Sequence, residues 1–223
     1  MSFSRGLKAK AAEVWEAGYQ HPFVQEIGQG TLDKSKFQFY LLQDYHYLLN
    51  YAKVFALAAV KADDELMLGR LTAIQSGIFE EMDLHRSYMA EFGITPEQVR
   101  TVKQSLYNRT YTANMLAVGQ TGDLVEILAT VFPCAWTYYD FACRLKEQYA
   151  DRLEGNFYKS WIESYSRDEF LQSFEWFYDV IDELVEGRSE VELEKITAIF
   201  VSSVEFEYLF WDMAYKQEMS YRL

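Results

Sequence analysis

Hydrophobic residues recur every three or four positions along most of this 223-residue chain, and no segment alternates regularly between apolar and polar residues. A repeat near 3.6 residues is typical of amphipathic helices, whereas alternation is typical of strands. The pattern therefore predicts an all-α fold, a helical bundle. The expected helices span residues 3–18, 34–61, 64–91, 96–105, 109–118, 123–149, 155–165, 168–186 and 189–217, and a loop or short helix covers 21–36.

Start signals support three of these helices. Residues 95–98 (TPEQ) form a capping box with proline at the first helical position, and Ser189 with Glu192 forms a second one. Asp63 or Asp64 can cap the helix over 64–91, because an aspartate side chain accepts hydrogen bonds from the first free amides of a helix.

The chain has 11 glycines and 3 prolines, and no Ser/Gly-rich linker or charge block divides it. Its length and 50% hydrophobic content suffice for one sizeable core, so we expect a single domain over residues 1–223. No apolar run is long enough to span a bilayer, and residues 1–18 lack the apolar centre of a signal peptide. These features predict a soluble, cytoplasmic protein that is not associated with membranes.

The net charge of −13 argues against nucleic-acid binding, because an acidic surface repels phosphate backbones. The two cysteines, Cys134 and Cys143, do not make a disulfide framework. On one predicted helix they lie about half a turn apart around the axis, so they cannot pair with each other. Two free thiols are typical of a reducing cytosol.

One charged residue interrupts the apolar stripe of the helix over 34–61. The stripe consists of Phe37, Leu41, Leu48, Tyr51 and Phe55. Asp44 lies on it, and burying an unpaired charge costs on the order of several kcal/mol, so Asp44 needs a partner. Tyr47 lies three residues on, on the same side of the helix, whereas His46 points away from both.

The helix over 189–217 repeats this arrangement with a glutamate. Its stripe consists of Ile196, Phe200, Ser203, Phe210 and Ala214. Glu207 lies on the stripe, while Glu205 lies about 200° away around the helix and is expected to be solvated. An inward carboxylate is often only a satisfied core group, so neither Asp44 nor Glu207 defines a site by itself.

Cys134 lies within VFPCAWTYYDF, residues 131–141, and Tyr138 follows it one turn later on the same face. Pro133 kinks the helix or restarts it, and a restart would put Cys134 in a first turn, where the helix dipole favours the thiolate. A lone buried cysteine is more often structural than reactive, and the 17 Tyr, 16 Phe and 5 Trp suit a ring-packed core as well as a pocket for a flat molecule. The coincidence of a thiol, two inward carboxylates and tyrosines on different helices favours one cavity, where these groups could perform addition–elimination on an electron-poor ring.

A metal site is the main rival interpretation for a helical bundle. A di-iron bundle uses Glu-x-x-His on two helices, and this pattern is missing from the sequence. Glu81 and His85 are one turn apart and could share a metal, but we expect His85 to be a surface residue. His21 precedes Pro22 and is expected to order a loop. We therefore expect no metal, and the sequence has no phosphate-binding or CxxC motif.

Four blocks of the sequence resemble the TenA family, the thiaminase II or aminopyrimidine aminohydrolase proteins. They are HPFVQEIGQGTLDKSKFQFYLLQDYHYL, GDLVEILATVFPCAWTYYDF, WIESYSRDEF and EFEYLFWDMAY, in order along nearly the whole chain. The resemblance implies a haem-oxygenase-like fold without haem or another cofactor, as a homotetramer. It implies hydrolysis of 4-amino-5-aminomethyl-2-methylpyrimidine to the hydroxymethylpyrimidine of thiamin salvage, and cleavage of thiamin to the same pyrimidine and a thiazole.

The resemblance also implies roles for catalytic residues. Cys134 matches the family's nucleophile, and its presence places the chain with the cysteine-bearing branch. Glu207 matches the general acid that protonates the pyrimidine ring. Tyr47 matches a tyrosine that bonds to the cysteine and raises its nucleophilicity.

Four further residues match positions that bind the substrate in the family. Asp44 matches the carboxylate that binds the aminopyrimidine edge, and Tyr138 matches a tyrosine that contacts the substrate. Tyr111 and Tyr165 match pocket tyrosines, and the block around Tyr111, YNRTYTAN, is the loosest match.

Two alternatives remain on the same fold. One is a protein that binds an aminopyrimidine without catalysis, and the other is a metal-dependent oxidase. Release of ammonia from the aminomethylpyrimidine distinguishes the hydrolase from both.

Overall fold

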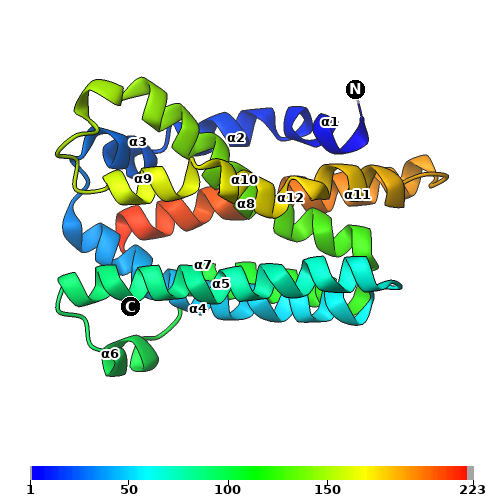
Figure 1. Cartoon of the computed structure of the whole chain (residues 1–223), viewed down its shortest axis with the longest axis horizontal. Coiled ribbons are helices and arrows are strands. Elements are labelled where there is room, and N and C mark those ends of the chain that lie inside the picture. The colour runs from blue at the N-terminus through cyan, green and yellow to red at the C-terminus, as the bar shows by residue number, and fades with distance from the viewer. Residues whose placement is uncertain (1, 220–223) are drawn as a thin grey trace. The chain divides into compact units, whose positions relative to one another are not determined.

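The computed structural model describes residues 2–219, apart from the side chain of Leu84. All elements in these residues are helical, which confirms the all-α prediction (Figure 1). They are α1 (Phe3–Lys10), α2 (Ala12–Tyr19), α3 (Pro22–Gln29), α4 (Lys34–Val60), α5 (Glu65–Glu91), α6 (Pro96–Thr101), α7 (Leu106–Thr121), α8 (Leu124–Gln148), the 3₁₀ turn η1 (Ala150–Arg152), α9 (Lys159–Tyr165), α10 (Asp168–Phe174), α11 (Trp176–Leu184) and α12 (Glu190–Lys216). None of the described helices is long and apolar enough to cross a membrane.

The four longest helices, α4, α5, α8 and α12, begin and end within a residue of the predicted bounds. Their start signals act as expected. Asp64 accepts a hydrogen bond from the amide of Met67 at 2.8 Å, and Ser189 and Glu192 bond reciprocally. Residues 95–98 also form the predicted capping box, at the start of α6.

Two expected helices are each split in two. The helix predicted over 3–18 breaks at Ala11, although the apolar stripe of Leu7, Ala11 and Trp15 continues across the break. A stripe that continues through a bend gives no sequence signal for it, so the prediction of one helix was wrong. The helix predicted over 168–186 is likewise interrupted, at Glu175.

Shorter elements differ at their ends. The helix predicted over 96–105 ends at Thr101, and the next helix starts at Leu106 instead of 109 because the Ser105 hydroxyl accepts a hydrogen bond from the amide of Tyr107 at 3.3 Å. The segment 21–36 contains the short helix α3, for which His21 is the cap: its Nδ1 accepts from the amide of Phe23 at 3.1 Å.

The chain divides into two compact units, whose boundaries fall inside α8 and α12. The first unit comprises Met1–Leu32 and Leu128–Asp212, and the second comprises Asp33–Ile127 and Met213–Leu223.

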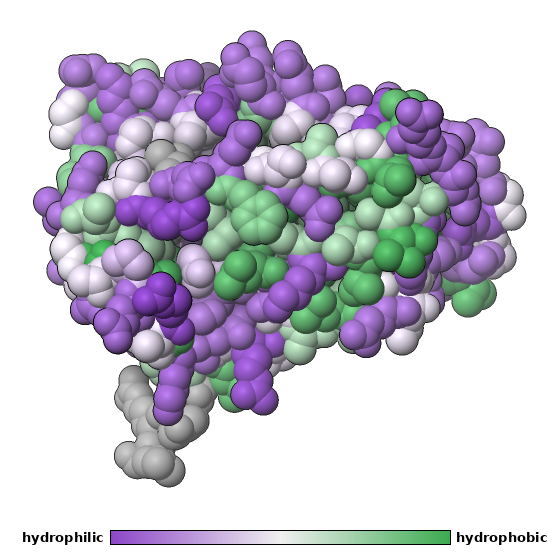
Figure 2. All heavy atoms as spheres, turned by 60° about the horizontal axis from the view of Figure 1, so that its bottom comes forward, coloured by the Kyte–Doolittle hydropathy of each residue, from purple (hydrophilic) through white to green (hydrophobic). Residues whose placement is uncertain are grey.

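In the second unit, α4 packs along both α5 and α7, and these helices run alongside one another in Figure 1. The rings of Phe37 and Tyr88 meet at 5.7 Å near one end of the α4–α5 pair. Further along, Gln75 Nε2 donates to the carbonyl of Ala52 at 2.9 Å. Figure 2 shows apolar side chains gathered between polar ones on one face of the molecule. Several large apolar residues of this unit are exposed, among them Val60, Leu66, Leu68 and Phe79.

In the first unit, α1 packs on α11 and α2, and aromatic rings of α8 and α12 fill the space inside. Phe132 is fully buried and stacks on Trp136 with ring centroids 4.8 Å apart. Phe200 of α12 contacts both rings, and Trp15 of α2 stacks on Phe200 at 6.5 Å. Much of the aromatic excess of the sequence therefore serves as core.

Gly28 of α3 is needed for close packing in the first unit. A Cβ atom at this position would lie 2.5 Å from Cδ2 of Tyr149 and 2.7 Å from Cδ2 of Leu145. We expect Gly28→Ala to lower the free energy of unfolding by about 1–3 kcal/mol through overpacking. Gly6→Ala in α1, where a Cβ meets nothing within 4 Å, is the control and should be neutral or slightly stabilising. Equal thermal midpoints for the two variants would contradict this explanation.

Candidate functional site

The predicted site residues lie in both units. The first unit holds Cys134, Tyr138, Tyr165 and Glu207, and the second holds Asp44, Tyr47 and Tyr111. All but the cysteine are buried; Asp44 and Glu207 are each 3% exposed, which confirms that both carboxylates face inward. Cys134 is half-buried. Glu205 is exposed, as the helical pattern predicted.

Two contacts define the register between α8 and α12 inside the first unit. The hydroxyls of Thr130 and Ser203, 73 residues apart in the chain, lie 3.0 Å from each other. Two turns further along both helices, the rings of Tyr138 and Trp211 meet at 5.0 Å, again with a separation of 73 residues. Cys134 and Glu207 lie midway between these pairs along the two helices, and they are also 73 residues apart in the chain. The register therefore places the thiol and the buried carboxyl on facing turns of two parallel helix segments.

Aromatic rings surround Tyr138, one turn beyond Cys134. The Tyr138 ring lies 4.9 Å from that of Tyr165 and 5.7 Å from that of Trp161, in addition to its contact with Trp211. The rings of Trp161 and Tyr165 also meet edge to face at 4.9 Å. The structure thus brings the predicted Tyr138 and Tyr165 together beside the facing turns, in surroundings that suit a flat, partly polar ring.

Pro133 does not restart α8. The helix continues from Leu124 to Gln148 with Pro133 inside it, so Cys134 lies in the helix interior. The alternative in which a first-turn dipole favours the thiolate was therefore wrong. A proline can be accommodated inside a helix when tertiary packing on both sides holds the helix together.

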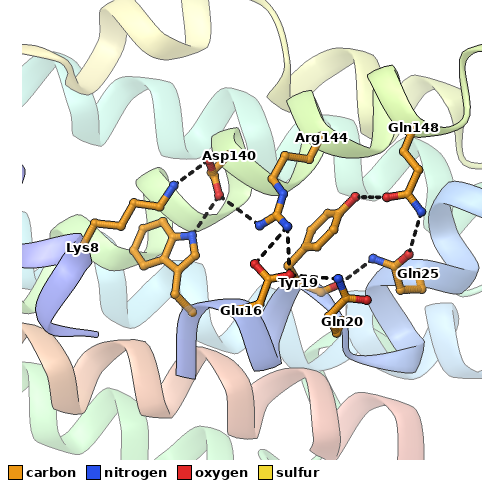
Figure 3. Close-up of polar contacts among 9 residues, drawn as sticks. Lys8, Glu16, Tyr19, Gln20, Gln25, Asp140, Arg144 and Gln148 are labelled. Atoms are coloured by element: carbon orange, nitrogen blue, oxygen red, sulfur yellow. Dashed lines mark hydrogen bonds and ion pairs between the residues drawn. The ribbon is translucent and has the colours of Figure 1, made fainter. Parts of the chain in front are cut away.

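A polar network in the first unit holds the later half of α8 against the N-terminal helices (Figure 3). The Asp140 carboxylate accepts from Lys8 Nζ and from the Trp15 indole, both at 2.8 Å, and Arg144 lies 3.7 Å away. Arg144 also pairs with Glu16 of α2 at 2.9 Å. Each exposed ion pair contributes little, but together they fix the orientation of the helix that carries Cys134.

Tyr47 and Tyr111 meet in the second unit. Their hydroxyl oxygens lie 3.5 Å apart and their ring centroids 5.2 Å apart. The fully buried Gln43, next to Asp44 on α4, holds the start of α7 in place. Its Oε1 accepts a hydrogen bond from the amide of Ser105 at 2.7 Å, and its backbone carbonyl accepts one from Asn108 Nδ2 at 2.6 Å. These bonds fix the start of α7 against α4, so Tyr111 faces Tyr47.

The partner of Asp44 is His85 of α5, a residue that we expected at the surface. His85 is 2% exposed, and its Nδ1 lies 2.9 Å from Asp44 Oδ2. Burial alone would lower the pKa of the imidazole, but the Asp44 carboxylate and, after it, that of Glu81 raise the pKa above its ordinary value. The expectation of a surface histidine was therefore wrong.

A sequence signal for this burial did exist. His85 belongs to the apolar stripe of α5. The buried members of the stripe are Leu71, Ile78, Met82 and Met89. A histidine on such a stripe faces inward, so the helical pattern of α5 already marks His85 as a candidate partner for Asp44.

The other histidines have structural roles. His21 caps α3, and His46 Nε2 lies 2.9 Å from the carbonyl oxygen of Val102. Within residues 2–219, no group of three or more His, Cys, Asp or Glu side chains is arranged to hold a metal ion.

Comparisons with known proteins place these features in context. A family model described as the TENA/THI-4/PQQC family matches residues 8–217. The aminopyrimidine aminohydrolase of Halalkalibacterium halodurans is 41% identical over 220 residues, 98% of each chain. That of Helicobacter pylori is 43% identical over 217 residues, 97% of this chain and 100% of the relative.

Solved structures agree with the predicted haem-oxygenase-like fold. The TenA homologue of P. horikoshii OT3 has a TM-score of 0.86 at 27% identity, covering 97% of this chain and 99% of its own. A domain of unknown function with a heme oxygenase-like fold from Shewanella denitrificans OS217 has a TM-score of 0.76 at 18% identity, covering 96% and 92%, and this likeness bears on the fold alone. The prediction of fold class is confirmed.

The second thiol, Cys143, is half-buried with its Sγ 4.0 Å from the carbonyl oxygen of Ser166. Burial raises the pKa of this thiol and outweighs the Tyr139 hydroxyl, which lowers it. Because the thiolate is the reactive form, we expect iodoacetamide to alkylate Cys143 more slowly than N-acetylcysteine at about pH 8, with half-maximal rate at a higher pH. The rates are measured in the Cys134→Ser variant, where Cys143 is the remaining thiol. A half-maximal pH at or below that of N-acetylcysteine would contradict the expectation.

Proposed function

The chain belongs to the TENA/THI-4/PQQC family, and we propose that it is an aminopyrimidine aminohydrolase of the thiaminase II type that acts in thiamin salvage. The observation that carries this function is the identity of 41% and 43% to aminopyrimidine aminohydrolases over nearly the whole chain. The reaction converts 4-amino-5-aminomethyl-2-methylpyrimidine and water to the 5-hydroxymethyl pyrimidine and ammonia. Thiamin gives the same pyrimidine and a thiazole.

The chemistry that we propose begins with activation of the ring. The amine is bound to an exocyclic carbon from which water does not displace it directly. The ring must therefore first become an electron donor that can expel the amine. Glu207 gives a proton to a ring nitrogen while the Cys134 thiolate forms a C–S bond to the neighbouring ring carbon. The facing turns of α8 and α12, fixed by the Thr130–Ser203 contact at 3.0 Å, support this pairing of nucleophile and acid.

The remaining steps release ammonia and restore the ring. The amine leaves in its protonated form, so the electron-rich adduct expels it from the exocyclic methylene as neutral ammonia. Water then adds to that carbon and loses a proton, which replaces the one that the departing amine carried. The C–S bond then breaks, the ring nitrogen returns its proton to Glu207, and the thiolate of Cys134 is regenerated. Overall, the aminomethylpyrimidine and water give the hydroxymethylpyrimidine and ammonia.

Tyrosines and a carboxylate bind the ring in this proposal. Asp44 accepts a hydrogen bond from the 4-amino group, and Tyr138 and Tyr165 contact the ring faces. Tyr47 supports the nucleophile, and Tyr111 orients Tyr47 through the hydroxyl contact of 3.5 Å. The proposal uses groups of both units, so we also propose that the chain acts as one domain over residues 1–223.

We further propose that the protein is a cytoplasmic homotetramer. A reducing compartment suits two free cysteines. Exposed apolar side chains of α5, among them Leu66 and Phe79, suit burial between subunits. The assembly itself rests on the family resemblance.

Cys134→Ser tests the nucleophile. We expect ammonia release from the aminomethylpyrimidine to fall by about 10³-fold or more, because a serine hydroxyl is a far weaker nucleophile, while the thermal midpoint stays close to wild type. Cys143→Ser is the matched control and should keep nearly full activity. Near-normal turnover in Cys134→Ser would exclude the cysteine adduct.

Glu207→Gln tests the acid against a neighbouring glutamate. We expect this change to lower kcat by about 10²- to 10⁴-fold, because the amide cannot supply the proton to the ring. Glu205→Gln, at an exposed position on the same helix, should have little effect. If steady-state assays show the larger loss for Glu205→Gln, the assignment of the acid is wrong.

A further inference from the structure

His85 is held beside Asp44 by the packing of α4 against α5 in the second unit. The two helices run antiparallel, and their contacts step along the pair in register. Phe37 meets Tyr88 at 5.7 Å, and Tyr40 meets the His85 ring at 6.3 Å. Asp44 follows one turn after Tyr40, so it reaches the same imidazole from the next turn of α4.

The ion pair with His85 involves one particular carboxylate oxygen of Asp44, Oδ2. Nδ1 of His85 lies 2.9 Å from Oδ2, so the imidazole engages one oxygen of the carboxylate. Asp44 is 3% exposed and His85 is 2% exposed, so water competes little for this contact. Fixing Oδ2 fixes the plane of the carboxylate, and with it the direction of the lone pairs of Oδ1.

We propose that His85 is a positioning residue that holds Asp44 Oδ2 through the buried ion pair with its Nδ1 and thereby directs Oδ1 to the 4-amino group of the aminopyrimidine. The inference rests on the proposed function, which gives Asp44 the amine edge of the substrate. It adds that recognition of the amine depends on a histidine of a second helix that does not itself touch the ring. The arrangement is a carboxylate–histidine pair in which the histidine orients and the carboxylate binds.

A purely structural role of His85 and a positioning role predict different effects on ligand binding when the histidine is replaced. If His85 only compensates the buried charge of Asp44, its loss should weaken all ligands of the site equally or destabilise the fold. If His85 directs Oδ1, its loss should weaken ligands that carry the 4-amino group more than ligands that lack it. The preference between two such ligands therefore separates the two roles.

The experiment measures binding by titration calorimetry for 4-amino-5-hydroxymethyl-2-methylpyrimidine and for its analogue without the 4-amino group. We expect wild type to prefer the amino compound, and His85→Leu to reduce the ratio of the two dissociation constants by about 10-fold or more. Gln75→Leu is the packing control: it removes another α4–α5 contact, with Ala52, and should keep the wild-type ratio.

A second pair of variants covers the case in which His85→Leu does not fold. The side-chain amide of asparagine can place an N–H near the position of Nδ1, whereas that of glutamine reaches the position of Nε2. We therefore expect His85→Asn to retain most of the preference and His85→Gln to lose it.

The outcomes separate this inference from the proposed function. Wild-type protein that binds neither pyrimidine would overturn the proposed function and the inference with it. Wild-type protein that prefers the amino compound, together with an unchanged ratio in His85→Leu or in His85→Gln, would overturn the role of His85 alone.

Discussion

A carboxylate inside a helical unit loses its water and must be stabilised by the protein instead. This constraint acts on Asp44 in the second unit and on Glu207 in the first, each 3% exposed. The second unit meets it for Asp44 with a buried histidine at 2.9 Å. The attraction between two buried charged groups offsets their loss of hydration only when the distance and orientation of the groups are favourable. The surrounding structure must therefore hold the two side chains of such a pair in place.

Helix register supplies that geometry. In the first unit, Thr130 with Ser203 and Tyr138 with Trp211 fix parallel segments of α8 and α12. In the second unit, ring contacts such as that of Phe37 with Tyr88 fix the antiparallel pair of α4 and α5. A shift of one residue would turn a side chain by about 100° around its helix and separate each pair. The apolar and hydroxyl contacts that hold the register are therefore as necessary to the proposed chemistry as the reacting groups.

The two cysteines show how the same helix gives thiols different surroundings. Cys134 lies on the turn of α8 that faces the turn of Glu207, whereas Cys143 lies two and a half turns later, near the carbonyl of Ser166. Burial raises the pKa of Cys143 and keeps it as the thiol at neutral pH. A thiol that stays protonated on a shared helix is a natural control for one that is proposed to react.

The sequence by itself determined the all-α class, the bounds of the four longest helices and the inward direction of Asp44 and Glu207. Helical periodicity and capping are local properties, so residues close in the chain decide them. Tertiary structure alone decided the bend at Ala11, the continuity of α8 through Pro133 and the pairing of Asp44 with His85. Each depends on what packs against a helix from elsewhere in the chain. A stripe can show that a side chain faces inward, but only the packed neighbour shows which group it meets.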